Sequence, residues 1–550
     1  MRGFVSLTLA LGLALLLVQS GSGQVTQEWA RRINFGDAVG NDNIKGLAVD
    51  SQGNVFVGGT ASSLVPRMPH RFVVVKNAPN GDRVWIGQYP GPNHTGCIAQ
   101  DFVLDASGNT YLTGGHQPDS PAGPTDYLTV KFDPSGEVMW AATYDGPGQY
   151  FDNAEAIAVD DSGNVYVTGN ASVVPVIPYE GEDYGTIKYN AQGVQQWVAL
   201  YDGPLHSIDR AYDVAVDAQG DVYVLGSSVI DTVTGNSDMV TVKYNPQGIQ
   251  QWEARLLNSG NPSMLLVDDQ SNVFVSGQMA GAGSSDMAVA KYNSDGVQQW
   301  LAQYSYPGNE SVSAIALDAD GNIIATGSTN SGLSNKTITL KYNANGSLIW
   351  MRQYVSDSNG GYGLALDAEQ NIYVTGYTGW GYSHCLTLKY SPQGDLLWST
   401  IFNDHNNCSL GGYVALDAEG NVLVAGSCAI IHNPEAGQDF LTIKYSQDPA
   451  RTVQGKGCQS IPSPSTFSFV SSPNPFNPST AISYQLPADS HVSLKVYDTA
   501  GRLVETLVDG WRAAGTHELT LNAGDLASGM YFAKLEAGEY VGVQKMVLLK

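Results

Sequence analysis

The residues that most often carry chemistry show no arrangement typical of an enzyme. The nine histidines include no His-Glu-x-x-His pair for zinc, and no Gly-x-Ser-x-Gly turn presents a nucleophilic serine. No glycine-rich phosphate- or dinucleotide-binding pattern follows a predicted strand and opens a helix. The five cysteines are too few and too scattered for a Cys-x-x-Cys zinc site or a disulfide framework. We therefore predict no catalytic residue, no bound metal and no cofactor.

One carboxylate does recur at a fixed place. It opens the string Asp-x-x-Gly-Asn, or a close variant, at Asp50, Asp105, Asp160, Asp217, Asp268, Asp318, Asp367 and Asp417. The carboxylate of such a turn accepts hydrogen bonds from turn amides, while Gly and Asn tolerate positive φ. A calcium loop would need further oxygen ligands at alternating positions, which these strings lack. We interpret the aspartate as a turn residue.

The turns repeat every 49 to 57 residues, which is near the length of a four-stranded propeller blade. Short alternating runs flank each one, as in Ala156–Val159 before the turn and Val165–Gly169 after it, and predict a β-hairpin. A second hairpin follows, with Thr186–Tyr189, a Gly193 turn and then Trp197. Seven Gly-x-x-x-Trp copies place one large ring per repeat, which indicates packing between neighbouring sheets.

The order of the strands predicts a closed ring. Trp29 precedes every Asp hairpin, whereas the last repeat ends at Lys444-Tyr445 with no tryptophan strand after it. The N-terminal strand can therefore complete the last sheet, which leaves no long sheet edge exposed. We predict an all-β fold, an eight-bladed β-propeller closed by its N-terminal strand and followed by a small Ig-like β-sandwich. A solenoid would instead need capping repeats at both ends, and none is visible.

A lysine also recurs in the third strand of each repeat. The eight positions are Lys76, Lys131, Lys188, Lys243, Lys291, Lys341, Lys389 and Lys444. We expect these lysines to pair with acids such as Asp126, Asp183 and Asp238. Each acid lies five residues before its lysine and so on the opposite face of the strand, which predicts pairing between blades. The alternative is a ring of positive charge that faces the central channel.

These repeats resemble the bacterial SBBP-type β-propeller repeat family in two motifs, Val-Asp-x-x-Gly-Asn-Val-Tyr-Val-Thr-Gly and Thr-Ile-Lys-Tyr-Asn-x-x-Gly-x-x-x-Trp. The resemblance covers roughly residues 28 to 446 and implies a fold rather than an activity. Beyond it lie Asn474–Thr480, Val496-Tyr497-Asp498 and the apolar end at Val547–Leu549. This module resembles the C-terminal type A sorting domain of the type IX (Por) secretion system, related to the FlgD-type Ig-like module, and implies recognition by that machinery at the outer membrane.

The ends and the charge complete the domain organisation. Arg2 and the apolar run Leu9–Val18 have the form of a signal peptide. We predict a signal peptide at 1–23, a propeller at 24–446, a linker at 447–465 and a sorting domain at 466–550. No later segment is long and apolar enough to span a membrane. The net charge of −25 disfavours nucleic acid and anionic lipid as partners. The predicted location is outside a Gram-negative cell or on its surface.

The predicted binding face lies opposite the tight turns. Both turns of each repeat lie at one end of the sheet, so the longer loops emerge at the other end, where binding residues usually lie. The candidate residues are the aromatic and acidic side chains of these loops: Tyr150, Phe151, Tyr179, Glu180, Glu182, Trp380 and Tyr382. The leading hypothesis is a non-catalytic scaffold that binds glycan or protein there. The alternative is a polysaccharide lyase or hydrolase, or a quinone-dependent dehydrogenase, with a site at the channel mouth.

Overall fold

A computed structural model describes residues 25–549, with gaps at 36–41, 63–69, 118–123, 174–180, 282–283, 307, 331–334, 355–358, 380–382, 403–406, 431–437, 448–467, 473, 475, 487–489, 513–514, 525 and 538–539. The predicted signal peptide, Tyr179, Glu180, Trp380, Tyr382 and nearly all of the predicted linker lie outside these described residues. Apart from the short 3-10 turn η1 (Pro92–His94), the described elements are strands. Within the described ranges, no helix has the length and apolar character needed to cross a membrane.

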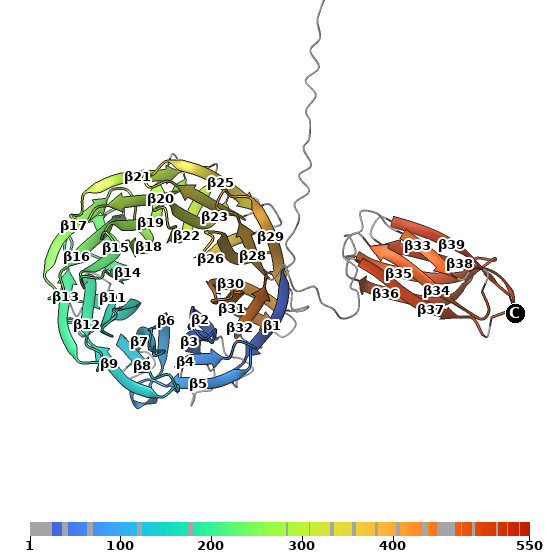
Figure 1. The fold of residues 1–550 in the computed structure, drawn as a ribbon, viewed down its shortest axis with the longest axis horizontal. Coiled ribbons are helices and arrows are strands. Elements are labelled where there is room, and N and C mark those ends of the chain that lie inside the picture. The colour runs from blue at the N-terminus through green and yellow to red at the C-terminus, as the bar shows by residue number, and fades with distance from the viewer. Residues whose placement is uncertain are drawn as a thin grey trace, which may run out of the picture. The chain divides into compact units, whose positions relative to one another are not determined.

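The described strands before residue 447 form eight four-stranded antiparallel sheets that lie side by side in a ring (Figure 1). The innermost strands are β2 (Asn43–Val49), β6 (Cys97–Leu104), β10 (Asn153–Val159), β14 (Asp209–Val216), β18 (Asn261–Val267), β22 (Asn309–Leu317), β26 (Asn359–Leu366) and β30 (Asn407–Leu416). The second strands are β3 (Val55–Ala61), β7 (Thr110–His116), β11 (Val165–Ser172), β15 (Val222–Asp231), β19 (Val273–Ala280), β23 (Ile323–Asn330), β27 (Ile372–Thr378) and β31 (Val422–Ile430).

The outer half of each sheet is built by the second hairpin. The third strands are β4 (Arg71–Asn77), β8 (Asp126–Phe132), β12 (Glu182–Tyr189), β16 (Asn236–Tyr244), β20 (Ser285–Tyr292), β24 (Asn335–Tyr342), β28 (His384–Tyr390) and β32 (Gln438–Ser446). The outermost strands are β5 (Arg83–Tyr89), β9 (Val138–Tyr144), β13 (Gln195–Tyr201), β17 (Gln250–Leu256), β21 (Gln298–Tyr304), β25 (Leu348–Tyr354), β29 (Leu396–Phe402) and β1 (Thr26–Ile33). These are the strands that the repeat predicts, and the all-β fold class is confirmed.

The N-terminal strand β1 joins the sheet formed by the last three propeller strands. It pairs antiparallel with β32, so that Trp29 lies opposite Lys444 and Ile33 opposite Phe440. Arg32 Nε donates a 2.5 Å hydrogen bond to the Asp439 carboxylate across this junction. β2 of the first sheet then packs against β30 and β31. The two ends of the repeat array therefore meet within one sheet.

Apolar side chains fill the space between each pair of neighbouring sheets. The layer between the last and first sheets contains Trp29, Val57, Val73, Leu423 and Phe440, and the other sheet pairs of the ring have equivalent layers. The tryptophan of each outermost strand reaches the next sheet. In seven sheets its indole N–H donates to a carbonyl of the next sheet's second turn, as from Trp197 to Pro246 at 3.0 Å, and Trp398 donates instead to the Gln447 side chain at 3.3 Å. The tryptophans therefore pack between sheets, as predicted.

Each innermost strand of the described ring contains a β-bulge at the same place. A bulge inserts one residue and bends the strand, which re-aims the side chains beside it. The residues at the bulges are Lys45, Gln100, Glu155, Tyr212, Ser263, Ser313, Tyr362 and Gly412. The repeated bulge gives the centre of the ring a set of side chains that differs from sheet to sheet.

The chain divides into two compact units, residues 1–449 and 450–550. The second unit has a sheet in the order β33-β34-β37 and another in the order β36-β35-β38-β39. Its strands are β33 (Ser468–Ser472), β34 (Ser479–Leu486), β35 (Ser490–Asp498), β36 (Leu503–Arg512), β37 (Gly515–Asn522), β38 (Gly529–Ala537) and β39 (Tyr540–Leu548). Side chains of both sheets, among them Tyr484, Leu494, Leu521 and Leu535, form one apolar core, as in a β-sandwich.

Candidate functional site

The tight-turn end of each sheet is occupied by satisfied polar groups. In the third sheet, Asp160 Oδ1 accepts hydrogen bonds from the amides of Ser162 and Asn164, both at 2.9 Å. Its Oδ2 accepts from the Asn164 side chain at 2.8 Å, and Gly163 has φ +76°. The recurring aspartate is thus a turn residue, as the sequence predicts.

The recurring lysines do not pair with Asp126, Asp183 or Asp238, so that prediction was wrong. Four of them reach the turn aspartate of their own sheet, as in Lys341 to Asp318 and Lys444 to Asp417, both at 2.8 Å, and Lys243 reaches Asp221 at the end of its turn. The reason is register: β24 places Lys341 opposite Ile324, two residues beyond the turn Asn322. In six other sheets the ammonium group also lies 4.9 to 5.0 Å from the centre of a second-strand aromatic ring.

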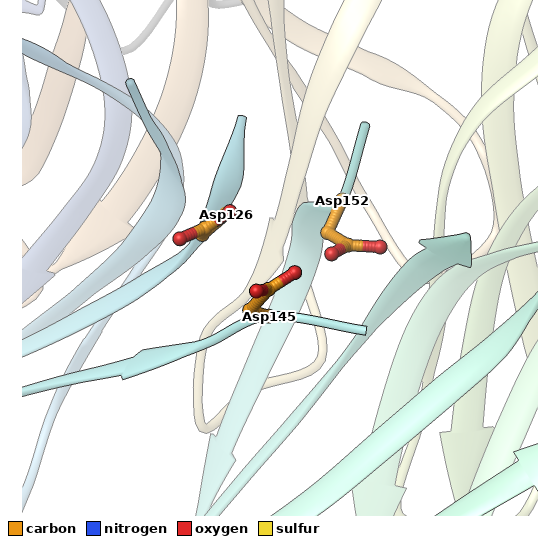
Figure 2. Close-up of side chains that lie close together, drawn as sticks. All are labelled: Asp126, Asp145 and Asp152. Carbon is orange, nitrogen blue, oxygen red and sulfur yellow. The ribbon is translucent and has the colours of Figure 1, made fainter. Parts of the chain in front are cut away.

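The opposite end of the ring, which we name the loop face, gathers carboxylates instead. Asp126 opens β8, Asp145 follows β9, and Asp152 precedes β10. One oxygen from each lies within 4.8 Å of the others, and Figure 2 shows the three side chains together. We name this set the first aspartate cluster. It lies where the third strand of the second sheet meets the crossover to the third sheet.

Backbone hydrogen bonds fix Asp152 in place. Its Oδ2 accepts from the Gly146 amide at 2.6 Å and its Oδ1 from the Ser172 amide at 2.5 Å. Its own amide donates to the Thr125 carbonyl at 2.6 Å. Asp152 is therefore a fully buried carboxylate that is bonded to both the second and the third sheet.

A second aspartate cluster repeats the arrangement one sheet further on. It consists of Asp183 in β12, Asp202 after β13 and Asp209 at the start of β14. Asp209 Oδ2 accepts from the Gly203 amide at 2.7 Å, just as Asp152 accepts from Gly146. Here the exposed His206 lies with Nδ1 2.5 Å from Asp202 Oδ2.

Burial and mutual repulsion raise proton affinity in both clusters. Burial, followed by the charges of Asp202 and Asp209, raises the pKa of Asp183 to about 7. Burial also raises the pKa of Asp152 to about 6; the Gly146 and Ser172 amides oppose this rise, and the charges of Asp145 and Glu182 add to it. Three carboxylates in so small a space favour a bound proton or another cation.

His116 stands beside the first cluster. It ends β7 opposite Asp126, is 3% exposed, and places Nε2 3.9 Å from Asp126 Oδ2. Neither of its ring nitrogens has a hydrogen-bond partner among the described residues. Burial lowers the pKa of His116, so its imidazole is neutral at pH 7. The second cluster has Ala171 at the equivalent position, opposite Asp183.

Three of the seven predicted binding residues are described. Tyr150 and Phe151 lie in the same crossover as Asp145 and Asp152, and their rings meet edge to face with centres 4.6 Å apart. Glu182 is buried and forms a 2.7 Å ion pair with Arg210. Because Arg210 already neutralises it, Glu182 is a framework residue rather than an available carboxylate.

Sequence inspection missed both aspartate clusters. The available signal was the string Tyr-Asp-Gly-Pro at Tyr144–Pro147 and again at Tyr201–Pro204, each followed by a further aspartate at Asp152 or Asp209. The string marks the crossover, which contributes two aspartates to each cluster. The third aspartate, Asp126 or Asp183, comes from an earlier strand. Only the folded sheet brings the three together.

Charged groups from three sheets also meet at the innermost strands. Lys45 Nζ donates to Gln100 Oε1 at 2.8 Å. Burial lowers the pKa of Lys45, and the charges of Glu155 and Asp101 counteract this. Burial raises the pKa of Asp101 to about 6, although its carboxylate accepts hydrogen bonds from the Ile157 and Phe102 amides. Lys45, Asp101 and Glu155 thus form a group drawn from neighbouring sheets.

A ring of four-stranded sheets joined to a separate β-sandwich defines a β-propeller protein with an accessory domain. Residues 28–64 and 148–173 match the model of the SBBP beta-propeller repeat. Residues 472–549 match the secretion system C-terminal sorting domain. The chain therefore contains SBBP-type β-propeller repeats and a type IX sorting domain. The domain indicates export to the cell surface, or beyond it, in a Gram-negative bacterium.

The chain is also similar, at low identity, to three other proteins. The chain is 14% identical to PorZ, a surface component of the type-IX secretion system of Porphyromonas gingivalis, with TM-score 0.36 over 92% of this chain and 75% of PorZ. The polysaccharide lyase Uly1 is 10% identical, with TM-score 0.40 over 76% and 91% of the two chains. The WD repeat-containing protein L264 of Acanthamoeba polyphaga mimivirus is 24% identical over 189 residues, which cover 26% of this chain and only 14% of that protein.

Proposed function

We propose that this exported propeller is a non-catalytic binding protein that holds a glycan or a protein at its loop face. The observation that carries the proposal is the crossover between β9 and β10. It presents the half-buried aromatic pair Tyr150 and Phe151 within one short loop that also contains Asp145 and Asp152. Aromatic rings stack on apolar sugar or side-chain surfaces, and carboxylates accept hydrogen bonds from hydroxyl groups and amides.

The rest of the ring supports this choice of face. The tight turns at the other end use the hydrogen-bonding capacity of their aspartates internally, as Asp160 does. The loop face has carboxylates that remain near one another and close to solvent, with Asp145 exposed. A rigid frame with variable loops is the usual architecture of a binding surface. Because the face and the whole chain are acidic, the favoured ligand is neutral or cationic.

The test is binding by the full exported chain on a glycan array and against surface proteins of the same cell. Tyr150→Ala with Phe151→Ala should weaken binding at least tenfold, because a stacked aromatic contact contributes about 1–3 kcal/mol. Tyr306→Ala is the matched control, because Tyr306 is a partly exposed tyrosine in a crossover without an aspartate cluster. Trp380→Ala tests another of the predicted aromatic residues in the same way. Equal binding by the unsubstituted chain and the double variant would refute the proposal.

A second candidate function is a polysaccharide lyase or hydrolase that works at the centre of the ring. The specific observation is that Lys45 lies near Asp101 and Glu155 of the next two sheets: its charge lowers the pKa of both carboxyl groups, and their charges raise the pKa of Lys45. Groups with shifted pKa values in one place are typical of acid and base catalysts. A reducing-sugar assay and an unsaturated-uronate absorbance assay on the same preparations decide it. Product formation that Glu155→Gln abolishes would favour the enzyme over the scaffold.

A further inference from the structure

We propose that Asp126, Asp145, Asp152 and His116 together bind one divalent cation at the loop face, between the second and third sheets. The spacing of the donor atoms fits such an ion. The three carboxylate oxygens lie within 4.8 Å of one another. Ligands on opposite sides of a divalent cation are roughly 4 to 5 Å apart, given metal–oxygen bonds of about 2.0–2.6 Å.

His116 points independently to a ligand at this place. It is a buried imidazole with no hydrogen-bond partner among the described residues, and its Nε2 lies 3.9 Å from an oxygen of the cluster. Buried polar nitrogens are normally satisfied, so an orphaned ring beside three carboxylates requires an explanation. A cation between His116 and Asp126 would supply the missing partner, because a neutral imidazole offers a lone pair to a metal.

The framework around the cluster is preorganised. Asp152 is held by the amides of Gly146 and Ser172, which leaves further lone pairs on both of its oxygens. Asp145 is exposed and stands at the open side of the cluster. The three carboxylate groups are close enough to repel one another. The bound ion would offset this repulsion and tie β8 to the crossover that carries Tyr150 and Phe151.

The second aspartate cluster provides a contrast within the same chain. There Ala171 occupies the position of His116, and the exposed imidazole of His206 already contacts Asp202. The two sites therefore share three carboxylates and differ in the buried nitrogen. We infer that the high-affinity site is the first cluster alone.

The presence of nitrogen in the ligand set selects the kind of ion. Imidazole suits zinc and similar transition metals, whereas calcium and magnesium prefer oxygen ligands only. We therefore expect Zn²⁺ to bind more tightly than Mn²⁺ or Ca²⁺. The site lies next to the proposed binding loop, yet it exists without any ligand on that loop.

The experiment is titration calorimetry of the full exported chain, stripped with a chelator, against ZnCl₂, MnCl₂ and CaCl₂ alone. The expected result is one equivalent of Zn²⁺ per chain, bound more tightly than Mn²⁺ or Ca²⁺. Asp145→Asn should weaken this binding at least tenfold, and Asp202→Asn, its counterpart in the second cluster, should leave it unchanged. Both residues are exposed, so neither variant should impair folding, and equal melting temperatures in chelator would verify this.

The His116→Gln variant measures how much the imidazole nitrogen contributes to metal binding, apart from the carboxylates. It should weaken Zn²⁺ binding and abolish the preference for Zn²⁺ over Ca²⁺. Absence of binding by all three ions, equal affinity in the Asp145→Asn chain, or a Ca²⁺-preferring site indifferent to His116→Gln would each overturn the proposal. No carbohydrate or protein ligand is present, so failure here and failure of the proposed function are distinguishable.

Discussion

At the scale of the residue, the same side chain does different work at the two ends of a sheet. A turn aspartate accepts hydrogen bonds within its own turn and can pair with the lysine of the third strand. Asp318, for example, accepts from the Asn322 amide and pairs with Lys341. The loop-face aspartates are buried beside like charges: burial, followed by the charges of Asp202 and Asp209, raises the pKa of Asp183 to about 7. Recurrence in sequence therefore marks the structural carboxylates, whereas among the described residues the aspartate clusters occur in two adjacent repeats.

Lys341→Met should destabilise the propeller strongly at neutral pH. The Lys341 and Asp318 side chains are only 7% and 2% exposed, and loss of one partner from a buried pair costs about 3–5 kcal/mol. Lys76→Met is the matched control, because Lys76 lies 4.0 Å from Asp50 and both side chains are more exposed. Thermal melting of the two variants should show the larger decrease for Lys341→Met. A larger decrease for Lys76→Met would contradict the ion-pair interpretation.

The same pair predicts a pH dependence. Burial alone would raise the pKa of Asp318, but hydrogen bonds from Lys341 and Asn322 outweigh burial and hold it below its ordinary value. A lowered folded-state pKa contributes stability above the unfolded pKa, near 3.8, that is lost as the pH falls through the folded value. The difference in melting temperature between the unsubstituted chain and Lys341→Met should therefore be full at pH 7 and shrink below about pH 4. A difference that grows on acidification would argue against this assignment.

At the scale of the element, neighbouring sheets are joined by a tryptophan that packs on a glycine turn. Gly248 has φ +79°, and a Cβ atom built there would lie 2.6 Å from Trp197 Cδ2. Glycine is required at this position for two reasons: the backbone is left-handed, and the indole ring leaves no room for a Cβ atom. The same packing recurs at Gly81 with Trp29 and at Gly346 with Trp300.

Gly248→Ala should lower the melting temperature of the propeller more than Gly235→Ala. Both glycines have positive φ, so the backbone penalty of about 1–2 kcal/mol is common to both variants. Gly235 has nothing within 4 Å of its added Cβ, whereas Gly248 meets the indole. The extra loss at Gly248 measures the contact between sheets. Equal losses would show that the indole moves aside without cost.

The hairpins and the tryptophan packing could be predicted because each depends on a few contiguous residues. Alternation, the Asp-x-x-Gly-Asn turn and the fixed tryptophan are local signals, and all of them correspond to elements of the structure. The ion-pair partner of the recurring lysine could not be predicted, because the partner depends on the register between strands such as β23 and β24. The cluster of Asp126, Asp145 and Asp152 likewise depends on a crossover that joins two sheets.

At the scale of the whole molecule, the ring depends on a pairing between the two ends of the repeat array. A chain without residues 26–33 should melt at a lower temperature and associate, because β32 would become an exposed sheet edge and Trp29 would be missing from its apolar layer. Light scattering coupled to size exclusion measures the association, and a chain that begins at residue 24 is the control. A monomeric truncated chain with unchanged melting would mean that β1 contributes nothing to closure.

The pairing of β1 with β32 also affects the order in which the propeller can be completed during synthesis. Arg32 and Asp439 are 407 residues apart, so the first propeller strand to be synthesised finds its partner only after almost every other strand has been made. A copy that stops short of β32 leaves that opening strand unmatched. The final sheet can therefore be completed only after synthesis has passed the last repeat, and a shorter copy keeps an unpaired strand to which another chain can bind.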